Sequence, residues 1–414
     1  MGRRLFMAGA GLAVVVFMLL FALDRPTVDE AILVQTSPVS TSTPAAESTS
    51  FPTATATPTV VPTPTEIPLR SITLSFTGEL LSHGGIIEQA RSNGTPDTSD
   101  YDYTPMFAAV APLISVADLA LCHQETPISS SNTALSGYPV FNAPREIADG
   151  IAAAGWDGCS VSSNHAIDKG FQGVTETLDE FDRVGIGHTG TARSEEERAN
   201  PPIYEIGGIA VGHMSWTYGT NGIPIPSSAP YSVNVTGVEA IKVEAAGLRA
   251  RGAEWIVLSV QWGNEYQRSP SATQSDQARE LLASPDIDLI IGAHVHVVQP
   301  AEVIDGELVL YGLGNFLSNQ SPQSCNSCPP GSQDGMIFTV TVEEALDGSL
   351  ATTHAQVTPT FVDRSIYEII PIAQRLADPD AALAESLRAS WARTNEAVYL
   401  LGVDPTLVGI DPIP

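Results

Sequence analysis

The chain has 414 residues, which is long enough for one large α/β domain or two smaller ones. Its 47 acidic residues outnumber its 19 basic residues, so the formal net charge is −28, and the lysines are limited to Lys169 and Lys242. Without a Lys/Arg cluster to neutralise phosphates, this composition excludes a nucleic-acid-binding protein and a basic lipid-binding patch on the folded part.

The N-terminus combines two positive charges with a long apolar run. Arg3 and Arg4 are followed by the 19 uncharged residues 5–23. A membrane-spanning helix needs about 20 apolar residues, whereas the core of a cleaved signal peptide needs only about 7–15. We therefore expect an uncleaved, single-pass signal anchor over residues 1–24, with a cleaved signal peptide as the alternative. By the positive-inside rule, the rest of the chain would lie outside the cytoplasm.

Residues 25–68 read as a linker, and within them residues 36–68 are dominated by Ser, Thr, Pro and Ala. Such a composition cannot bury a core and favours an extended, disordered chain. We expect a stalk that holds a folded domain, beginning near Leu69, away from the membrane.

From Leu69 onward, short apolar runs alternate with amphipathic stretches. The predicted strands cover residues 71–76, 118–122, 158–161, 203–206, 209–213, 255–260, 287–291, 308–311 and 336–340. The predicted helices cover residues 105–116, 144–154, 172–184, 237–251 and 274–283. This alternation indicates an α/β fold with substantial β content.

The four cysteines fit an oxidising exterior. Cys325 and Cys328 form a single C-x-x-C, for which a local disulfide is favoured over a zinc site. Cys122 and Cys159 each end an apolar run, so we expect buried free thiols there, with a disulfide between the two as the alternative.

Polar side chains repeatedly follow the predicted strands. These groups are Glu79 with His83, His123 with Glu125, Asn164 with His165, Gln261, and His294 with His296. In α/β sheets, ligands bind in the crevice beyond the carboxyl ends of the strands, so several strands can deliver such groups to one site. Carboxylate, amide oxygen and imidazole are the ligands expected for Mn, Fe or Zn. Each residue alone has a structural alternative as a loop residue or cap, but the repetition favours a shared site.

The two histidines of Gly292-Ala293-His294-Val295-His296 are the sharpest element. At positions i and i+2 of an extended segment, both rings would project to the same side. The remaining histidines His188, His213 and His354 lack such a setting, and we interpret them as structural or surface residues.

In chain order, these motifs resemble the blocks of the poly-γ-glutamate capsule biosynthesis (CapA) family. The blocks include Glu125-Thr126-Pro127, Asn164-His165-Ala166-Ile167-Asp168-Lys169-Gly170 and Gln261-Trp262-Gly263-Asn264-Glu265-Tyr266, within residues 71–340. The family is similar to calcineurin-like metallophosphoesterases. The resemblance therefore implies a metallophosphoesterase-like four-layer α/β/β/α sandwich over residues 69–365, with a helical extension over residues 366–414. It also implies one or two divalent metal ions between two stacked sheets.

The resemblance and the strand-end pattern together assign roles to residues. The expected metal ligands are Glu79, His83, Glu125, Asn164, His294 and His296. His165 would lie near the substrate as a general acid or a phosphate contact, and Asp118 and Asp168 would orient imidazoles. Glu79 stands where the family usually has Asp, and Gln261 stands where it usually has His. Gln261 is accordingly expected to be a weak ligand or a substrate contact, and these two departures put catalytic activity in doubt.

Three functions are compatible with the sequence. The first is the making or export of an anionic surface polymer such as poly-γ-glutamate, alongside a membrane polymer-synthesis complex. The second is a metal-dependent phosphoesterase or hydrolase of the envelope, unrelated to that polymer and acting on a phosphoester. The third is a non-catalytic scaffold that retains the fold. Fold-level analogy does not decide among them.

The predicted topology can be tested with protease added to intact, permeable-walled cells. Because residues 24 onward are expected outside the cytoplasm, the protease should cut within residues 36–68 and release the folded domain into the medium, as seen on immunoblots. A domain that stays fully protected until the cells are lysed would contradict this topology.

Overall fold

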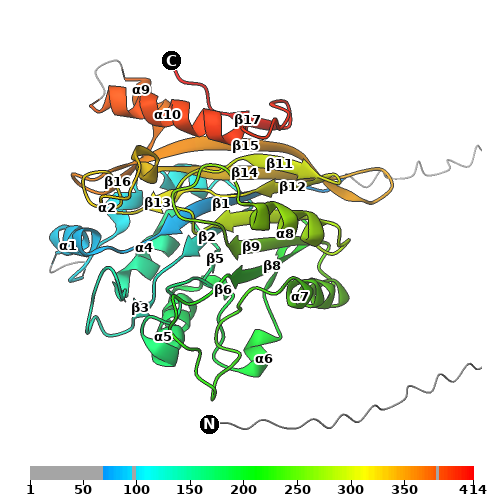
Figure 1. The fold of residues 1–414 in the computed structure, drawn as a ribbon, viewed down its shortest axis with the longest axis horizontal. Coiled ribbons are helices and arrows are strands. Elements are labelled where there is room, and N and C mark those ends of the chain that lie inside the picture. Colours follow the sequence, from blue (N-terminus) through cyan, green and yellow to red (C-terminus); the bar gives the residue numbers. More distant parts are fainter. Residues whose placement is uncertain (1–68, 96–98, 379–381) are drawn as a thin grey trace, which may run out of the picture. The chain divides into compact units, whose positions relative to one another are not determined.

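Two β-sheets packed face to face organise the part of the chain that the computed structural model describes, residues 69–95, 99–378 and 382–414 (Figure 1). The predicted anchor over residues 1–24 and the predicted linker over residues 25–68 lie outside these residues. Within the described ranges, no helix has the length and apolar character needed to cross a membrane.

The larger sheet has nine strands among the described residues. Its main path is β16 (Glu368–Pro371), β15 (Leu350–Asp363), β14 (Asp334–Glu344), β1 (Ser71–Leu80), β2 (Leu119–Gln124), β5 (Gly158–Ser160) and β6 (Gly187–Thr189). Two further strands join it, β13 (Asn315–Leu317) beside β1 and β17 (Val408–Ile410) beside β15. Strands β1, β2, β5 and β6 run parallel, so their carboxyl ends meet at one edge.

The smaller sheet has six strands within the same described part. Their order is β11 (Ala301–Ile304), β12 (Glu307–Leu310), β10 (Leu289–Ala293), β9 (Trp255–Gln261), β8 (Ile209–Thr217) and β7 (Ile203–Ile206). Strands β8, β9, β10 and β12 are parallel. A separate pair is formed by β3 (Ile128–Ser129) and β4 (Ala143–Pro144).

The core is layered because successive strand residues point to opposite faces of a sheet. Leu119 and Leu121 of β2 pack between the two sheets, whereas Ala120 and Cys122 face the helices outside. On that outer side lie α1 (Gly84–Asn93), α2 (Thr104–Phe107), α3 (Ala111–Ile114), α4 (Glu146–Ala154) and α5 (Gly170–Val184). The smaller sheet is covered by α7 (Val238–Ala250) and α8 (Ala272–Leu282). Helices thus cover the outer faces of two stacked sheets in a mixed α/β fold.

Two sequence-based expectations need correction. The single helix expected over residues 105–116 is two short helices, α2 and α3, because Pro112 has no backbone N–H to bond a preceding turn and is accommodated in the first turn of α3. Residues 366–414 are not purely helical. They contain α9 (Ile372–Leu376) and α10 (Ala384–Val398), but also β16 and β17, which pair with β15. Strands of three or four residues are too short to show a periodic pattern.

Both pairs of cysteines are disulfide-bonded. The local bond Cys325–Cys328 was expected, but the free thiols expected at Cys122 and Cys159 were not found. These two residues lie directly opposite each other on the parallel strands β2 and β5, with Cα atoms 4.4 Å apart. The spacing lies within the range that a disulfide can bridge, and only the strand pairing brings it about.

The two disulfides should differ in their contribution to stability. By the chain-entropy argument, the Cys122–Cys159 bond, with a sequence separation of 37, should contribute about 4 kcal/mol, and the Cys325–Cys328 bond only about 2 kcal/mol. Urea unfolding of the double alanine variant of each pair measures these free energies. Protein denatured without reductant should also show no free thiol. Four free thiols, or equal losses of stability in both variants, would contradict the pairing or its energetic ranking.

Candidate metal centre

Side chains from both sheets converge where the parallel strands end. Ligand atoms of Glu79, Glu125 and His296 all lie within 4.8 Å of one another, and the three residues are buried. Glu79 belongs to β1, Glu125 directly follows β2, and His296 comes three residues after β10. The strand register brings further polar groups to this edge. In the larger sheet Glu79 lies opposite His123, and in the smaller sheet Gln261 lies opposite Ala293, the residue before His294.

Glu79 connects the two sheets through its carboxylate. Its Oε1 accepts a hydrogen bond of 2.5 Å from the backbone amide of His294, and its Oε2 lies 3.6 Å from Nδ1 of His296. The residue has no exposed surface. Removing a carboxylate from water costs free energy. These partners, together with any further positive group in the site, offset that cost.

The sequence pattern predicted an extended segment after β10, but the backbone turns there instead. His294 has a φ of 91° and His296 a φ of 57°, both in the left-handed region that side chains other than glycine rarely adopt. Gly292 allows the close approach that precedes this turn, since a Cβ there would lie 2.0 Å from the carbonyl oxygen of Tyr311. Strained backbone of this kind is found at functional sites, where surrounding structure holds it in place.

Several buried acceptor atoms around this point make no hydrogen bond with the described residues. They are Glu79 Oε2, both carboxylate oxygens of Glu125, Asn164 Oδ1 and His294 Nδ1. Buried polar groups are nearly always paired in native proteins, so such a cluster requires an explanation. Carboxylate oxygens, an amide oxygen and imidazole nitrogens form the donor set of a divalent transition metal, and the residues present fit such an ion.

The electrostatics of the group agree with this interpretation. Burial lowers the pKa of His294 to about 3, which leaves the imidazole neutral and its lone pair available. Burial raises the pKa of Glu125 to about 7. Burial alone would lower the pKa of His296, but Glu125 and Glu79 outweigh that effect and raise it to about 9. The two carboxylates thus attract positive charge into a buried site.

Asn315 positions His296 and was not assigned a role from the sequence. Its Oδ1 lies 3.1 Å from Nδ1 of His296, and its own amide donates to the carbonyl of Ser332 at 2.8 Å. Asn315 lies in β13, within the residues 71–340 over which the chain resembles the family. Nothing in the local sequence indicates which side chain Asn315 contacts.

Gln261 is engaged with protein groups rather than free to bind a ligand. Its Oε1 accepts hydrogen bonds from the backbone amide of Asn164 at 2.6 Å and from the Thr217 hydroxyl at 3.1 Å. Its Nε2 donates to Nε2 of His123 at 3.0 Å, and Nδ1 of that histidine lies 2.7 Å from the Ser160 hydroxyl. In this arrangement Gln261 links the smaller sheet to the loop that carries Asn164, and its role as a weak ligand or substrate contact stays a prediction.

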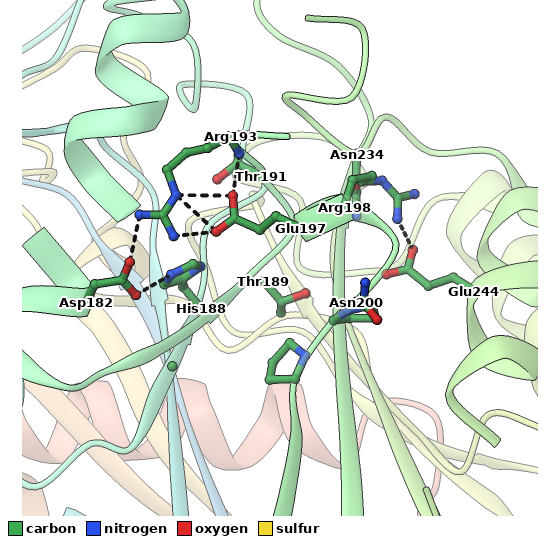
Figure 2. A pocket seen from close by; sticks show the side chains of 14 residues that line it. Asp182, His188, Thr189, Thr191, Arg193, Glu197, Arg198, Asn200, Asn234 and Glu244 are labelled. Atoms are coloured by element: carbon green, nitrogen blue, oxygen red, sulfur yellow. Dashed lines mark hydrogen bonds and ion pairs between the residues drawn. The ribbon is translucent and has the colours of Figure 1, made fainter. Parts of the chain in front are cut away.

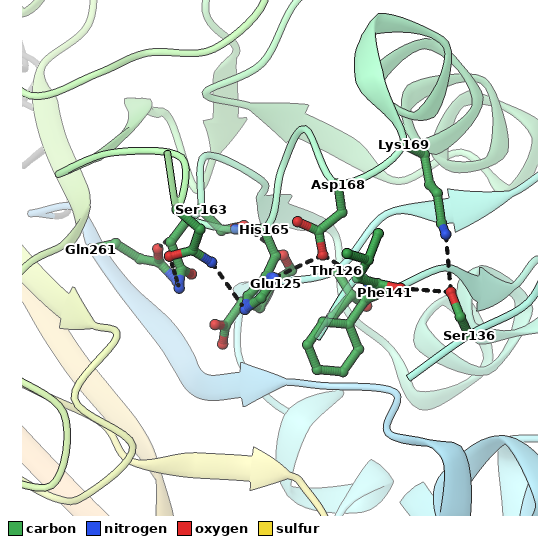
Figure 3. Close-up of polar contacts among 12 residues, drawn as sticks. Glu125, Thr126, Ser136, Phe141, Ser163, His165, Asp168, Lys169 and Gln261 are labelled. Atoms are coloured by element: carbon green, nitrogen blue, oxygen red, sulfur yellow. Dashed lines mark hydrogen bonds and ion pairs between the residues drawn. The ribbon is translucent and has the colours of Figure 1, made fainter. Parts of the chain in front are cut away.

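His165 and Asp168 form a hydrogen-bonded pair next to the predicted ligands (Figure 3). Nδ1 of His165 lies 2.8 Å from Oδ2 of Asp168, which also accepts a bond from the Phe141 amide at 2.7 Å. On the other side of the ring, Nε2 lies 3.4 Å from the side-chain nitrogen of Asn221, a residue that the sequence did not single out. The carboxylate of Asp168 therefore makes the imidazole contact that the sequence predicted for it.

The other two predicted residues lie differently. His83 is outside the trio, with Nδ1 3.2 Å from the Leu81 carbonyl, and burial lowers its pKa to about 4. Asp118 lies exposed at the amino end of β2, where its carboxylate accepts bonds from the amide and hydroxyl of Thr73 at 2.8 Å each. The prediction that Asp118 orients an imidazole is wrong, because a residue that precedes a parallel strand lies at the edge opposite the site.

A cavity of about 350 Å³ opens beside these residues. His83, His165 and His296 contribute to its wall, together with Tyr266 and the segment that ends at the Cys325–Cys328 disulfide. Its size suits a small molecule or the end of a polymer.

Known sequences match the part of the chain that carries these residues. The family described as "Bacterial capsule synthesis protein PGA_cap" matches residues 73–320, more than half of the chain. "PGA biosynthesis protein CapA" of Bacillus subtilis (strain 168) is 24% identical over 253 residues, covering 60% of this chain and 64% of that protein. "Capsule biosynthesis protein CapA" of Bacillus anthracis is 23% identical over 256 residues, covering 60% of each. The chain therefore spans about three fifths of the length of these curated relatives, and the resemblance inferred from the motifs is confirmed.

Solved structures show a more distant similarity. The calcineurin-like phosphoesterase YfkN from Bacillus subtilis is 13% identical with a TM-score of 0.44, covering 80% of this chain and 98% of that one. The NAD nucleotidase NadN of Haemophilus influenzae is 10% identical with a TM-score of 0.43, covering 83% of this chain and 58% of that one.

Metal binding can be tested by dialysis against Mn, Zn or Fe followed by elemental analysis. The wild-type protein should hold stoichiometric metal. Replacing the ligand in His296→Ala should lower the affinity more than about 100-fold, and Asn315→Ala, which removes only a positioning contact, should lower it about 10–100-fold. Circular dichroism should remain near that of the wild type.

His354→Ala is the matched control, because it removes an imidazole from an exposed position on β15. Its metal content should not change. Wild-type protein without stoichiometric metal, or equal losses in His296→Ala and His354→Ala, would refute the metal centre.

Proposed function

The chain belongs to the bacterial capsule synthesis protein family, and on this premise we propose that it acts in the synthesis or export of an anionic surface polymer of the poly-γ-glutamate type. The proposal includes a divalent metal at the convergent strand ends and a partner complex in the membrane. The curated relatives are named for this biosynthesis or for capsules, and the match covers the part of the chain that carries the strand-end residues.

The observation that carries the proposal is the cluster of buried, unpaired acceptors around Glu79, Glu125 and His294. Together with His296 and Asn164, these residues would hold Mn, Fe or Zn. When bound there, such an ion would supply Lewis-acid polarisation of a substrate oxygen. Gln261 contributes by holding the backbone of Asn164, so that its side-chain oxygen remains available.

His165 is the residue suited to proton transfer. Asp168 accepts a hydrogen bond from Nδ1–H of His165, and this leaves Nε2 as the nitrogen that can take or give a proton. The ring also lines the cavity, where it packs edge-on against Phe141 with ring centroids 4.7 Å apart. A substrate group in the cavity would meet the imidazole in one fixed orientation.

We further propose that the domain lies outside the cytoplasm, attached to the membrane in a single pass. Two features support this placement. Residues 1–24 have the charge and hydropathy pattern of a signal anchor. The two disulfides, Cys122–Cys159 and Cys325–Cys328, are typical of proteins in an oxidising compartment.

A second candidate function is hydrolysis of a phosphoester unrelated to the polymer. The His165–Asp168 pair beside a cavity of about 350 Å³ favours it, because a pure scaffold would have no need of an oriented acid–base group.

The function can be tested in the native host by replacing the gene with variants expressed at equal levels. Deletion and Glu125→Gln should both abolish surface poly-γ-glutamate, measured as glutamate released by acid hydrolysis of washed cells. In addition, His165→Ala should lower polymer formation about 100-fold or more while the purified protein keeps its metal, as expected for loss of a general acid or base. His354→Ala should have no effect.

Unchanged surface polymer in the deletion strain would refute the role in polymer synthesis. If the purified protein then hydrolyses bis-p-nitrophenyl phosphate, with loss of turnover in His165→Ala, the second candidate function is correct. Equal polymer in wild type and His165→Ala, with normal metal content, would instead indicate a scaffold.

A further inference from the structure

A second polar cavity, of about 280 Å³, shares no lining residue with the cavity beside the metal centre. It is bordered by β6, by the segment 190–202 that carries the short helix α6 (Glu195–Arg198), and by Glu244 of α7 (Figure 2). Neither the motifs nor the proposed function assigns a role to these residues.

The ionic groups of this cavity fall into two sets. On one side, Arg193 pairs with Asp179 and Asp182 at 2.7 Å each and also with Glu197, so its positive charge is fully compensated. On the other side, Arg198 faces Glu244 (Figure 2). The lining contains three carboxylates, of Asp182, Glu197 and Glu244, and two guanidinium groups. Counted over these carboxylates and guanidinium groups, the lining carries a formal excess of one negative charge.

Glu244 is the centre of this excess. Its side chain is only 7% exposed. Its Oε2 lies 3.1 Å from Arg198, and hydrogen bonds from the side chains of Trp216 and Arg198 lower its pKa. The Arg198 guanidinium stacks over the Trp216 ring at 4.8 Å, which fixes its direction. Burial raises the pKa of Glu244 to about 7 against the opposing effects of Arg198, Trp216 and Arg251, so these groups compensate the buried carboxylate only in part.

Asn234 contributes an unpaired acceptor to the cavity. The residue is 3% exposed, and its side-chain nitrogen donates to the Ser215 carbonyl at 3.0 Å, which fixes the amide so that Oδ1 is left without a donor. Asn234 Oδ1 is thus a buried acceptor without a donor, in the same cavity as a carboxylate that is compensated only in part. The missing partner must supply hydrogen-bond donors and positive charge.

We propose that this cavity binds a small primary amine as its ammonium ion. An ammonium group offers three donors and one positive charge, which matches the Glu244 carboxylate, the Asn234 amide oxygen and the charge excess. A carboxylate ligand would bring further negative charge to a lining in which carboxylates already outnumber guanidinium groups. At ~30 Å³ per water molecule, the volume equals roughly nine waters, so the ligand is a short-chain amine.

The test is calorimetric titration of the full-length protein with n-butylamine at about pH 8, above the pKa of Glu244. The amine should bind saturably at one site per chain. Two probes of similar size separate the contributions, because n-butanol lacks the charge and sodium butyrate carries the opposite charge, so neither should bind. Tetramethylammonium has the charge without donors and should bind at least about tenfold more weakly.

Three variants identify the residues. Glu244→Gln should weaken n-butylamine binding about tenfold or more, the loss expected for one charged hydrogen bond. Glu239→Gln removes the same charge from the exposed side of the same helix, α7, and should leave binding unchanged. Arg198→Gln removes the competing cation beside Glu244 and should tighten binding, which structural damage would not do.

Failure of n-butylamine to bind, or binding of butyrate instead, would overturn the proposal. Equal weakening by Glu239→Gln and Glu244→Gln would also overturn it, since it would indicate attraction by the overall negative charge. Should Glu244→Gln fail to fold, Arg198→Gln decides, and binding that it does not tighten counts against the site. None of these outcomes depends on polymer synthesis or on metal content, so they test this inference separately from the proposed function.

Discussion

The hydrogen bond from the His294 amide to the Glu79 carboxylate joins the two sheets at the edge where their parallel strands end. Glu79 comes from the larger sheet, and His294 directly follows β10 of the smaller one. Because Glu79 is fully buried, its charge must be offset by nearby donors and cations. The turn through His294 and His296, and with it the placement of both imidazoles, depends on this contact.

Gln261 forms the second link between the sheets, and it clarifies the departure from the family pattern. Where the family usually has an imidazole, this chain has an amide that can donate and accept at once. It accepts from Asn164 and Thr217 while it donates to His123. A neutral imidazole has one donor and one acceptor nitrogen and could not satisfy all three partners. The substitution therefore exchanges a potential metal ligand for a rigid connection beneath the site.

Both proposed sites are identified by buried oxygen atoms that lack a hydrogen-bond donor. At Glu125 and at Asn234, buried oxygens remain without donors, and the pKa of the carboxylate at each site, Glu125 and Glu244, is raised by burial to about 7. The neighbouring side chains show which ligand each site suits. Imidazole nitrogens beside Glu125 suit a transition metal, whereas the amide oxygen of Asn234 and a partly compensating arginine beside Glu244 suit an ammonium ion.

The sequence by itself determined the alternating α/β elements, the family and most residues at the strand ends, because apolar runs and the polar residues after them are local patterns. It identified Asp168 correctly but misplaced Asp118, since proximity along the chain does not tell which end of a parallel strand faces the site. Only the tertiary structure decided the pairing of Cys122 with Cys159, the contact of Asn315 with His296 and the bridging role of Gln261. Each of these contacts joins residues from different strands or loops, and their distances are set by sheet register and packing, which no local pattern encodes.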